Sequence, residues 1–336
     1  MNGQADFAAR LLHWYAKHGR HGLPWQQDRS LYRVWVSEIM LQQTQVATVI
    51  PYYQRFIARF PDVGALADAH DDEVMRLWAG LGYYARARNM LRAARSVRDD
   101  HGGSFPETLD AVSALPGVGP STAAAILALA CDQRHPILDG NCRRVYARHA
   151  GIDGWPGARE TAQRLWACAE RYTPHGDAAA YTQAIMDLGA TVCTRSRPAC
   201  GQCPVAADCQ AREHGLTAVL PAPRPRVVRP HREATVLVVR SSDGAFLLER
   251  RPPTGIWGGL WSLPEVLPQH APEDAVALPT LRHAFTHFTL DIRPLLVDAT
   301  SESVRDAQAQ AWVAPDTLDG YGLPSPIRKI LARIAG

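Results

Sequence analysis

One carboxylate of this sequence, Glu38, lies within a strongly apolar run, Val34–Leu41. On a helix, its neighbours three and four residues away include Val34, Trp35 and Leu41. A carboxylate on an apolar helix face is either a paired structural charge or a desolvated acid whose raised pKa keeps a proton available near neutral pH. The residues alone leave these two interpretations open.

A second carboxylate, Asp139, directly precedes a predicted helix that begins at Asn141. An aspartate at this place is most simply an N-cap, because its side chain accepts hydrogen bonds from the first N–H groups of the helix. A protonated carboxyl and an ionised one are also the pair that glycosidic cleavage through an oxocarbenium-like state requires. In that chemistry the acid activates the leaving group, and the anion stabilises or attacks the sugar cation.

A glycine turn joins two helical runs within the segment Leu115–Ile126, which contains Gly117 and Gly119. Glycine permits a positive φ and leaves no Cβ in the path of a ligand. The second helix is expected to begin at Pro120 or Ser121, so its free N–H groups and positive dipole end would complete a phosphate site. The alternative is a tight turn between two packed helices.

Four of the seven cysteines stand close together, with spacings of six, two and five residues: Cys193, Cys200, Cys203 and Cys209. Four thiolates bind either tetrahedral zinc or an iron–sulfur cluster. Zinc sites more often place two close pairs on either side of a longer span. One short loop with uneven spacing favours a [4Fe–4S] cluster. Clustered cysteines of this kind also indicate metal binding in a reducing compartment rather than disulfide bonds.

Several of these segments resemble known families. The run Leu115–Ala123 is similar to the helix-hairpin-helix element of the DNA base-excision glycosylases of the endonuclease III superfamily, and the cysteine loop is similar to their [4Fe–4S] loop. The run Trp35–Val46 resembles the signature of the MutY adenine DNA glycosylases almost letter for letter.

The MutY resemblance implies that Glu38 protonates adenine in the scissile nucleotide and that Asp139 supports the cationic sugar, with Asn141 beside it. It also implies that Trp25 lies near the adenine pocket. A flipped base leaves a gap in the stack that a wedge can fill. The residues that the resemblance assigns to DNA binding are Gln43, Tyr83, Gly117, Gly119 and Ser121.

The scarcity of lysine bears on the type of glycosylase. Of the 36 basic residues only Lys17 and Lys329 are lysines, and neither lies near the motifs. In bifunctional relatives of the endonuclease III type a lysine nucleophile occupies the position of Ser121, and some MutY relatives have a lysine where Arg143 and Arg144 stand here. Arginine is not an amine nucleophile at neutral pH. We therefore expect a monofunctional enzyme that uses water and leaves an abasic site.

The C-terminal part resembles the Nudix-like module of MutY proteins over Arg250–Pro264. No Gly-x5-Glu-x7-Arg-Glu-x2-Glu-Glu box follows, so the module is expected to recognise rather than hydrolyse. The run His283–Phe288 is similar to the Phe-Ser-His loop of the family, which implies that Phe285, Thr286 and His287 contact 8-oxoguanine. Thr286 replaces the serine but keeps the hydroxyl. The alternative for this run is a β-hairpin with a buried aromatic side chain.

A chain of 336 residues is long enough for two domains with separate cores. Residues 1–215 are expected to form an all-α helix-hairpin-helix domain with the iron–sulfur loop 193–209, residues 216–231 a Pro/Arg-rich linker, and residues 232–336 an α+β Nudix-like domain. Besides the two helices of the hairpin, helices are predicted over 7–15, 31–41, 46–60, 63–69, 72–79, 84–99, 141–150, 158–172, 178–191 and 327–334. Strands are predicted over 235–239, 246–248, 257–263, 285–292 and 311–313.

The expected activity is removal of adenine from double-stranded DNA with A:8-oxoguanine or A:G mispairs. The net charge of +3 does not by itself indicate a nucleic-acid partner. The N-terminus lacks a signal peptide and no apolar run approaches the ~20 residues of a membrane helix. We expect a cytoplasmic monomer, nucleoid-associated if bacterial.

Two alternative functions remain. One is a thymine-glycol or G·T mismatch glycosylase, which the run Gln42–Gln45 and the C-terminal module disfavour. The other is a non-catalytic lesion-binding protein, which the presence of Glu38 and Asp139 disfavours.

Overall fold

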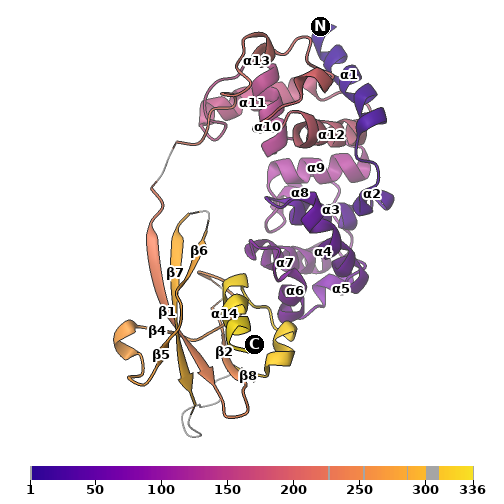
Figure 1. The fold of residues 1–336 in the computed structure, drawn as a ribbon. Helices are drawn as coiled ribbons and strands as arrows, with labels where there is room; N and C mark the ends of the chain where they lie inside the picture. Colours follow the sequence, from indigo (N-terminus) through magenta and orange to yellow (C-terminus); the bar gives the residue numbers. More distant parts are fainter. Residues whose placement is uncertain (1, 226–227, 253, 286, 300–309, 336) are drawn as a thin grey trace. The chain divides into compact units, whose positions relative to one another are not determined.

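The computed structural model describes residues 2–225, 228–252, 254–285, 287–299 and 310–335 (Figure 1). The chain divides into two compact units, one made of residues 1–67 and 92–226 and the other of residues 68–91 and 227–336. The break near residue 226 lies within the predicted linker. The grouping of residues 68–91 with the second unit was not indicated by the sequence. No described helix is both long and apolar enough to cross a lipid bilayer.

The first unit is built from helices, and its described residues form no strand. Every predicted helix is present, with ends displaced by a few residues except for 31–41, whose ends match. The helix predicted over 178–191 ends at Asp187 and continues as a π-helical turn, η1. The helices of residues 1–225, including two that lie wholly or partly in the second unit, are α1 (Asn2–His18), α2 (Pro24–Gln27), α3 (Leu31–Leu41), α4 (Val46–Arg59), α5 (Val63–Ala67), α6 (Asp71–Trp78), α7 (Ala85–Asp100), α8 (Leu109–Ala114), α9 (Pro120–Cys131), α10 (Gly140–His149), α11 (Arg159–Tyr172), α12 (Ala178–Asp187), η1 (Leu188–Val192), η2 (Cys200–Gln202) and α13 (Gln210–Glu213).

Helix α9 is the central element of the first unit. Its residues from Ala123 to Leu129 are all buried, as expected for a helix that is apolar on every side. Figure 1 shows α9 between α12 and the pair α3 and α8, and all three helices pack against it. Helix α3, which carries Glu38, and helix α12 are therefore both held in place by α9.

The hairpin between α8 and α9 has the predicted shape, but only one of its glycines needs a special backbone. Gly117 has a φ of +79°. Gly119 is the N-cap of α9 with an extended backbone and a φ of −91°, so of the two glycines only Gly117 uses the positive φ that glycine permits. A Cβ atom on Gly119 would meet nothing within 4 Å. The packing around residue 119 therefore does not itself require glycine.

The second unit contains an eight-stranded sheet in the order β3-β2-β1-β7-β5, with β4 beside β1, β6 beside β7 and β8 beside β2. Its strands are β1 (His231–Arg240), β2 (Phe246–Arg250), β3 (Trp261–Ser262), β4 (Glu265–Val266), β5 (Val276–Ala277), β6 (Leu281–Ala284), β7 (Thr289–Asp298) and β8 (Gln310–Val313). The predicted hairpin of β1 and β2 is confirmed, with Arg240 opposite Phe246. Helix α14 (Ser325–Ala335) supplies Ile327, Ile330 and Leu331 to the core of this unit (Figure 1).

Two predicted strands are wrong in their first halves. Of residues 257–263 only Trp261–Ser262 is a strand, because Trp257 lies in a turn between Gly255 and Gly259. Of residues 285–292, the strand begins at Thr289. Phe285 lies outside a strand and donates a 2.9 Å hydrogen bond from its N–H to the Phe288 carbonyl, between β6 and β7. In both cases an apolar run continues through a chain reversal, so hydrophobicity alone overextended the strand.

Candidate active site

A cleft with a volume of about 780 Å³ opens in the first unit, lined by α3, α9, the start of α10 and the end of α12. It brings together six of the residues that the sequence singles out: Trp25, Glu38, Gln43, Ser121, Asp139 and Asn141. Gly117 and Gly119 lie in the hairpin and do not line this cleft. Tyr83 belongs to the second unit.

Glu38 is the partly buried acid of the cleft. Burial, and then the charge of Asp139, raise the pKa of Glu38 to about 7. No cation among the described residues forms an ion pair with it. The geometry therefore supports the desolvated acid rather than the paired structural charge, and a proton is available near neutral pH.

Asp139 is the N-cap of α10, as the simpler interpretation predicted. Its Oδ1 accepts a hydrogen bond of 2.7 Å from the backbone N–H of Cys142. The cap does not exclude catalysis, because the same carboxylate lines the cleft and acts electrostatically on Glu38.

Ser121 supports the segment that leads to Asp139. Its hydroxyl oxygen accepts a hydrogen bond of 2.9 Å from the backbone N–H of Leu138, a residue that is 1% exposed. Ser121 also lines the cleft. The side chain that replaces a lysine nucleophile in this sequence therefore connects the start of α9 to the chain just before α10.

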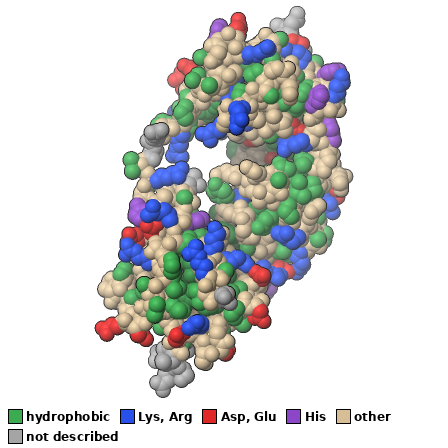
Figure 2. Space-filling view, in the orientation of Figure 1, with side chains coloured by type: hydrophobic (Ala, Val, Ile, Leu, Met, Phe, Trp, Pro, Cys, Tyr) green, Lys and Arg blue, Asp and Glu red, His purple; other side chains and the backbone are tan. Residues whose placement is uncertain are grey.

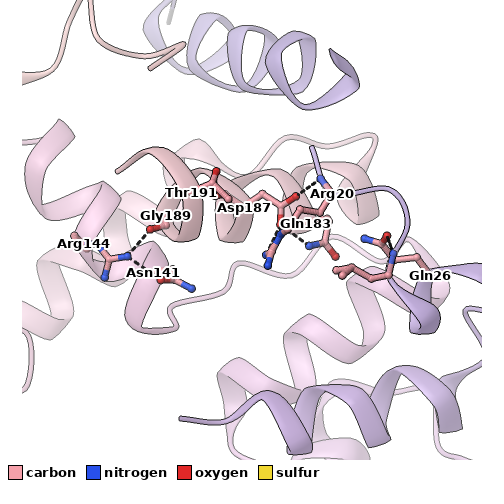
Figure 3. A network of polar contacts seen from close by, with 9 residues as sticks. Arg20, Gln26, Asn141, Arg144, Gln183, Asp187, Gly189 and Thr191 are labelled. Carbon is pink, nitrogen blue, oxygen red and sulfur yellow. Dashed lines mark hydrogen bonds and ion pairs between the residues drawn. The ribbon is translucent and has the colours of Figure 1, made fainter. Parts of the chain in front are cut away.

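A buried ion pair borders the cleft, and the sequence analysis missed it. The Asp187 carboxylate is fully buried at the end of α12 and accepts hydrogen bonds from Arg20 N–H at 2.7 Å, Arg20 Nε at 2.8 Å and Gln183 Nε2 at 2.8 Å (Figure 3). Arg20 and Gln183 also line the cleft. The only available signal was an aspartate within an apolar helical run, because its arginine partner lies 167 residues away.

Arg144 connects the cleft to the cysteine loop. Its guanidinium donates to Asn141 Oδ1 at 2.8 Å and to the Gly189 carbonyl (Figure 3). Its Nε also donates to the Cys193 carbonyl at 2.7 Å. The sequence analysis treated Arg144 only as a residue in place of lysine. In the structure Arg144 joins the first turn of α10, the π-helical turn η1 and the start of the cysteine loop. Its hydrogen bond to Oδ1 also orients the Asn141 amide.

All four cysteines of the loop line one small pocket. Arg148 Nη1 donates to Cys193 Sγ at 3.4 Å, and Cys209 Sγ donates to the Arg148 carbonyl at 3.5 Å. Burial raises the pKa of Cys203 to about 11, and the charges of the other three thiolates contribute to the rise. No three described Cys, His, Asp or Glu side chains are close enough to hold a single metal ion. The four cysteines that line this pocket are the donor set that a [4Fe–4S] cluster requires.

The two residues expected to enter DNA have unusual backbones. Gln43 has a φ of +58° and Tyr83 a φ of +50°, in the left-handed region that residues with a Cβ rarely occupy. Both side chains are exposed, and Tyr83 is 46% exposed although it is aromatic. The guanidinium of Arg86 lies 5.4 Å from the Tyr83 ring. Strained, exposed positions of this kind concentrate at functional sites.

The predicted recognition loop of the second unit is the turn between β6 and β7. Phe285 is half-buried and stacks on Phe288, with ring centroids 4.5 Å apart. His287 is exposed. Thr286 lies outside the described residues. The hairpin alternative is thus correct as a description of the backbone, and the role of this turn in recognition remains a prediction.

Three family models match the chain. Residues 36–171 match the HhH-GPD superfamily base excision DNA repair protein, residues 193–209 the iron-sulfur binding domain of endonuclease III, and residues 235–333 the NUDIX domain. These matches confirm the predicted fold class and the iron–sulfur loop.

Curated adenine DNA glycosylases match most of this chain. The adenine DNA glycosylase of Buchnera aphidicola subsp. Acyrthosiphon pisum is 34% identical, over 97% of this chain and 96% of that protein. The human adenine DNA glycosylase is 37% identical, over 77% of this chain and 57% of that protein. Among solved structures, a thermostable thymine-DNA glycosylase is 27% identical with a TM-score of 0.58, covering 63% of this chain and 97% of that chain.

Proposed function

Because the chain belongs to the family of adenine DNA glycosylases, we propose that it hydrolyses the N-glycosidic bond of adenine mispaired with 8-oxoguanine or guanine in double-stranded DNA. One observation carries the proposal: Glu38, whose pKa is about 7, shares a cleft with Asp139, a carboxylate held at a helix N-terminus. Glycosidic cleavage requires this combination of a protonated acid and an anion.

Glu38 acts as the general acid. With a pKa of about 7, a large fraction of this side chain carries a proton at neutral pH. Proton transfer to a ring nitrogen of adenine makes the base a better leaving group, so the bond between the base and the sugar C1′ breaks with its electrons on the base. The apolar surroundings of Glu38 on α3 keep the proton on the acid until the base arrives.

Asp139 stabilises the positive charge that develops on the sugar, and Asn141 lies beside it in the first turn of α10. The hydrogen bond from Cys142 N–H fixes one carboxylate oxygen, so the anion does not need to reorganise as the charge forms. Arg144 orients the Asn141 amide by binding its oxygen.

Water is the nucleophile. The described residues that line the cleft include arginines but no lysine. Lys17 and Lys329 are exposed on α1 and α14. Addition of water to C1′, with loss of its proton, leaves an abasic site and free adenine. No amine forms a Schiff base, so the enzyme is monofunctional.

DNA contact involves three features. The exposed Gln43 and Tyr83 fill or support the gap that the flipped adenine leaves. The hairpin of Gly117 and Gly119 and the start of α9 bind a backbone phosphate. The turn with Phe285, Thr286 and His287 reads 8-oxoguanine in the opposite strand. Trp25, which is buried in α2 and lines the cleft, packs beside the adenine.

The cysteine loop holds a [4Fe–4S] cluster through Cys193, Cys200, Cys203 and Cys209, and the cluster supplies a rigid fold to the loop. We infer that residues 1–215 carry the glycosylase activity, residues 216–231 form a linker and residues 232–336 carry the recognition role. We also infer that the protein works as a monomer in the cytoplasm, on the nucleoid if the source is bacterial.

Single-turnover cleavage of four duplexes tests this function: adenine opposite 8-oxoguanine, adenine opposite guanine, a G·T mispair and thymine glycol. The expected result is release of adenine, with strand scission only after alkali and no adduct trapped by borohydride. Excision of thymine or thymine glycol in preference to adenine would favour the alternative glycosylase. Binding without release of any base would favour a non-catalytic lesion-binding protein. A trapped adduct would overturn the assignment of water as the nucleophile.

A further inference from the structure

Trp257 has a left-handed backbone that its side chain does not favour. Its φ is +55°, and it stands between Gly255 at +87° and Gly259 at +76°. Glycine adopts this region at little cost, but a residue with a Cβ does not. A hydrogen bond of 2.8 Å from Arg251 N–H to the Leu260 carbonyl closes the turn at its base. The turn therefore presents a strained tryptophan where a third glycine would fit the backbone better.

The indole ring of Trp257 is the first of four aromatic rings that lead to the proposed recognition turn. It lies 5.8 Å from the Phe285 ring and 6.3 Å from the His283 ring. His283 packs edge-on against Phe285 at 4.6 Å, and Phe285 stacks on Phe288 at 4.5 Å. All four rings are half-buried. We call this set, Trp257, His283, Phe285 and Phe288, the aromatic row.

A hydrogen bond from Phe285 N–H to the Phe288 carbonyl joins these two residues between β6 and β7. The β6–β7 pairing reaches Ala284 and Thr289 on either side. At the far end of the row, the Arg232 guanidinium lies 4.5 Å over the Phe288 ring. The Phe285 ring contacts Trp257, His283 and Phe288.

We propose that Trp257 is a positioning residue for Phe285 and thereby sets the preference for adenine opposite 8-oxoguanine over adenine opposite guanine. The inference rests on the proposed recognition role of the turn 285–288. 8-Oxoguanine and guanine differ by few atoms, so discrimination depends on where the reading side chains stand. The ring of Trp257 packs against Phe285 from a separate turn of the chain. Its packing compensates for its unfavourable backbone.

The test compares variants in full-length, cluster-loaded protein. Trp257→Gly removes the ring and relieves the backbone, so loss of folding does not confuse the result. Trp257→Phe keeps a ring at the same place. Trp312→Ala is the matched control, since Trp312 is an exposed tryptophan of β8 outside the aromatic row. The measured quantity is the ratio of single-turnover rates for adenine opposite 8-oxoguanine and opposite guanine, together with the thermal unfolding midpoint.

We expect Trp257→Gly to lower this ratio about threefold to tenfold, the range that loss of one or two aromatic pairs gives. Trp257→Phe should restore most of the ratio, and Trp312→Ala should leave it unchanged. Phe285→Ala should lower it at least as much, and the double variant should lower it no further than Phe285→Ala alone, because Trp257 acts through Phe285.

Two results would overturn the inference, and they are distinguishable. If Phe285→Ala lowers the ratio and Trp257→Gly does not, the turn recognises the lesion without help from Trp257, and the proposed function stands. If Phe285→Ala leaves the ratio unchanged, the recognition role of the turn fails, and the role of Trp257 fails with it.

Discussion

A Cβ atom on Gly189 would lie 2.6 Å from the Cβ of Asn141. Real Cβ atoms do not approach so closely, so the π-helical turn η1 and the first turn of α10 are in contact only because residue 189 is glycine. The Gly189 carbonyl also accepts a hydrogen bond from Arg144, which binds Asn141 as well. The spacing between these two segments therefore fixes the place of Asn141 beside Asp139.

Gly189→Ala should separate η1 from α10. We expect a loss of about 1–3 kcal/mol in stability from overpacking and at least a tenfold loss in the single-turnover rate, because Asn141 and the cap at Asp139 move. Gly176→Ala is the control, since a Cβ there meets nothing within 4 Å. Equal behaviour of the two variants in thermal unfolding and adenine release would show that the contact has no functional weight.

Ser121→Ala should leave the backbone N–H of Leu138 without its hydrogen bond in a buried environment. A buried unsatisfied donor costs about 1–3 kcal/mol, and we expect the single-turnover rate to fall severalfold because Asp139 is the next residue. Urea unfolding and adenine release measure the two effects. Ser104→Ala, at an exposed position, should change neither. A Ser121→Ala variant as active and as stable as the control would contradict the supporting role.

Glu38→Gln should abolish adenine release and change the pH dependence of stability. The pKa of Glu38 rises from 4.5 to about 7 on folding, so the folded state binds more protons than the unfolded state between these values. The wild type therefore loses stability as the pH rises from about 4.5 to 7, by roughly 3 kcal/mol. The variant lacks this titration.

Urea unfolding at pH 4.5 and pH 8 measures the effect. The stability of Glu38→Gln relative to the wild type should be about 3 kcal/mol more favourable at pH 8 than at pH 4.5. Glu73→Gln, at a site on α6 outside the cleft, serves as the control. A constant difference across this range would mean that Glu38 is not a desolvated acid.

Cys203→Ser should prevent cluster assembly. We expect loss of the visible absorbance of the cluster and at least tenfold weaker binding to a mispaired duplex, because the loop 193–209 has only the short turn η2 as regular structure. Cys168→Ser, on α11 and outside the loop, should retain both properties. Normal duplex binding by a Cys203→Ser protein without iron would show that the cluster does not shape the DNA-binding surface.

Local signals in the sequence were sufficient for the helices and for most of the cleft. The helix 31–41 was predicted with its observed ends, and in the structure the Ser30 side chain caps its start by accepting a hydrogen bond from Arg33 N–H. Asp139 was predicted as a cap or a catalytic group, and it caps α10 while lining the cleft. Six residues of the predicted site meet in that cleft because α3, which carries Glu38, packs against α9, and the chain after α9 leads to Asp139 at the start of α10.

Contacts between distant residues were not predictable in the same way. Arg20 and Asp187 pair across 167 residues, and nothing near either residue indicates the other. The close approach of Gly189 to Asn141 depends on how α12 continues as a π-helical turn, which hydrophobic periodicity does not distinguish from an α-helix. Trp257 was expected in a strand because turns that need a positive φ are recognised by glycine, and this one uses tryptophan.

The two lysines give the protein a built-in pair of labelling sites. Lys17 is exposed on α1 of the first unit, and Lys329 is exposed on α14 of the second. Apart from the terminal amine, an amine-reactive dye therefore attaches at one place in each unit without any substitution. Energy transfer between donor and acceptor dyes on Lys17 and Lys329 would report, in the native sequence, whether the distance between these two lysines changes when a mispaired duplex binds.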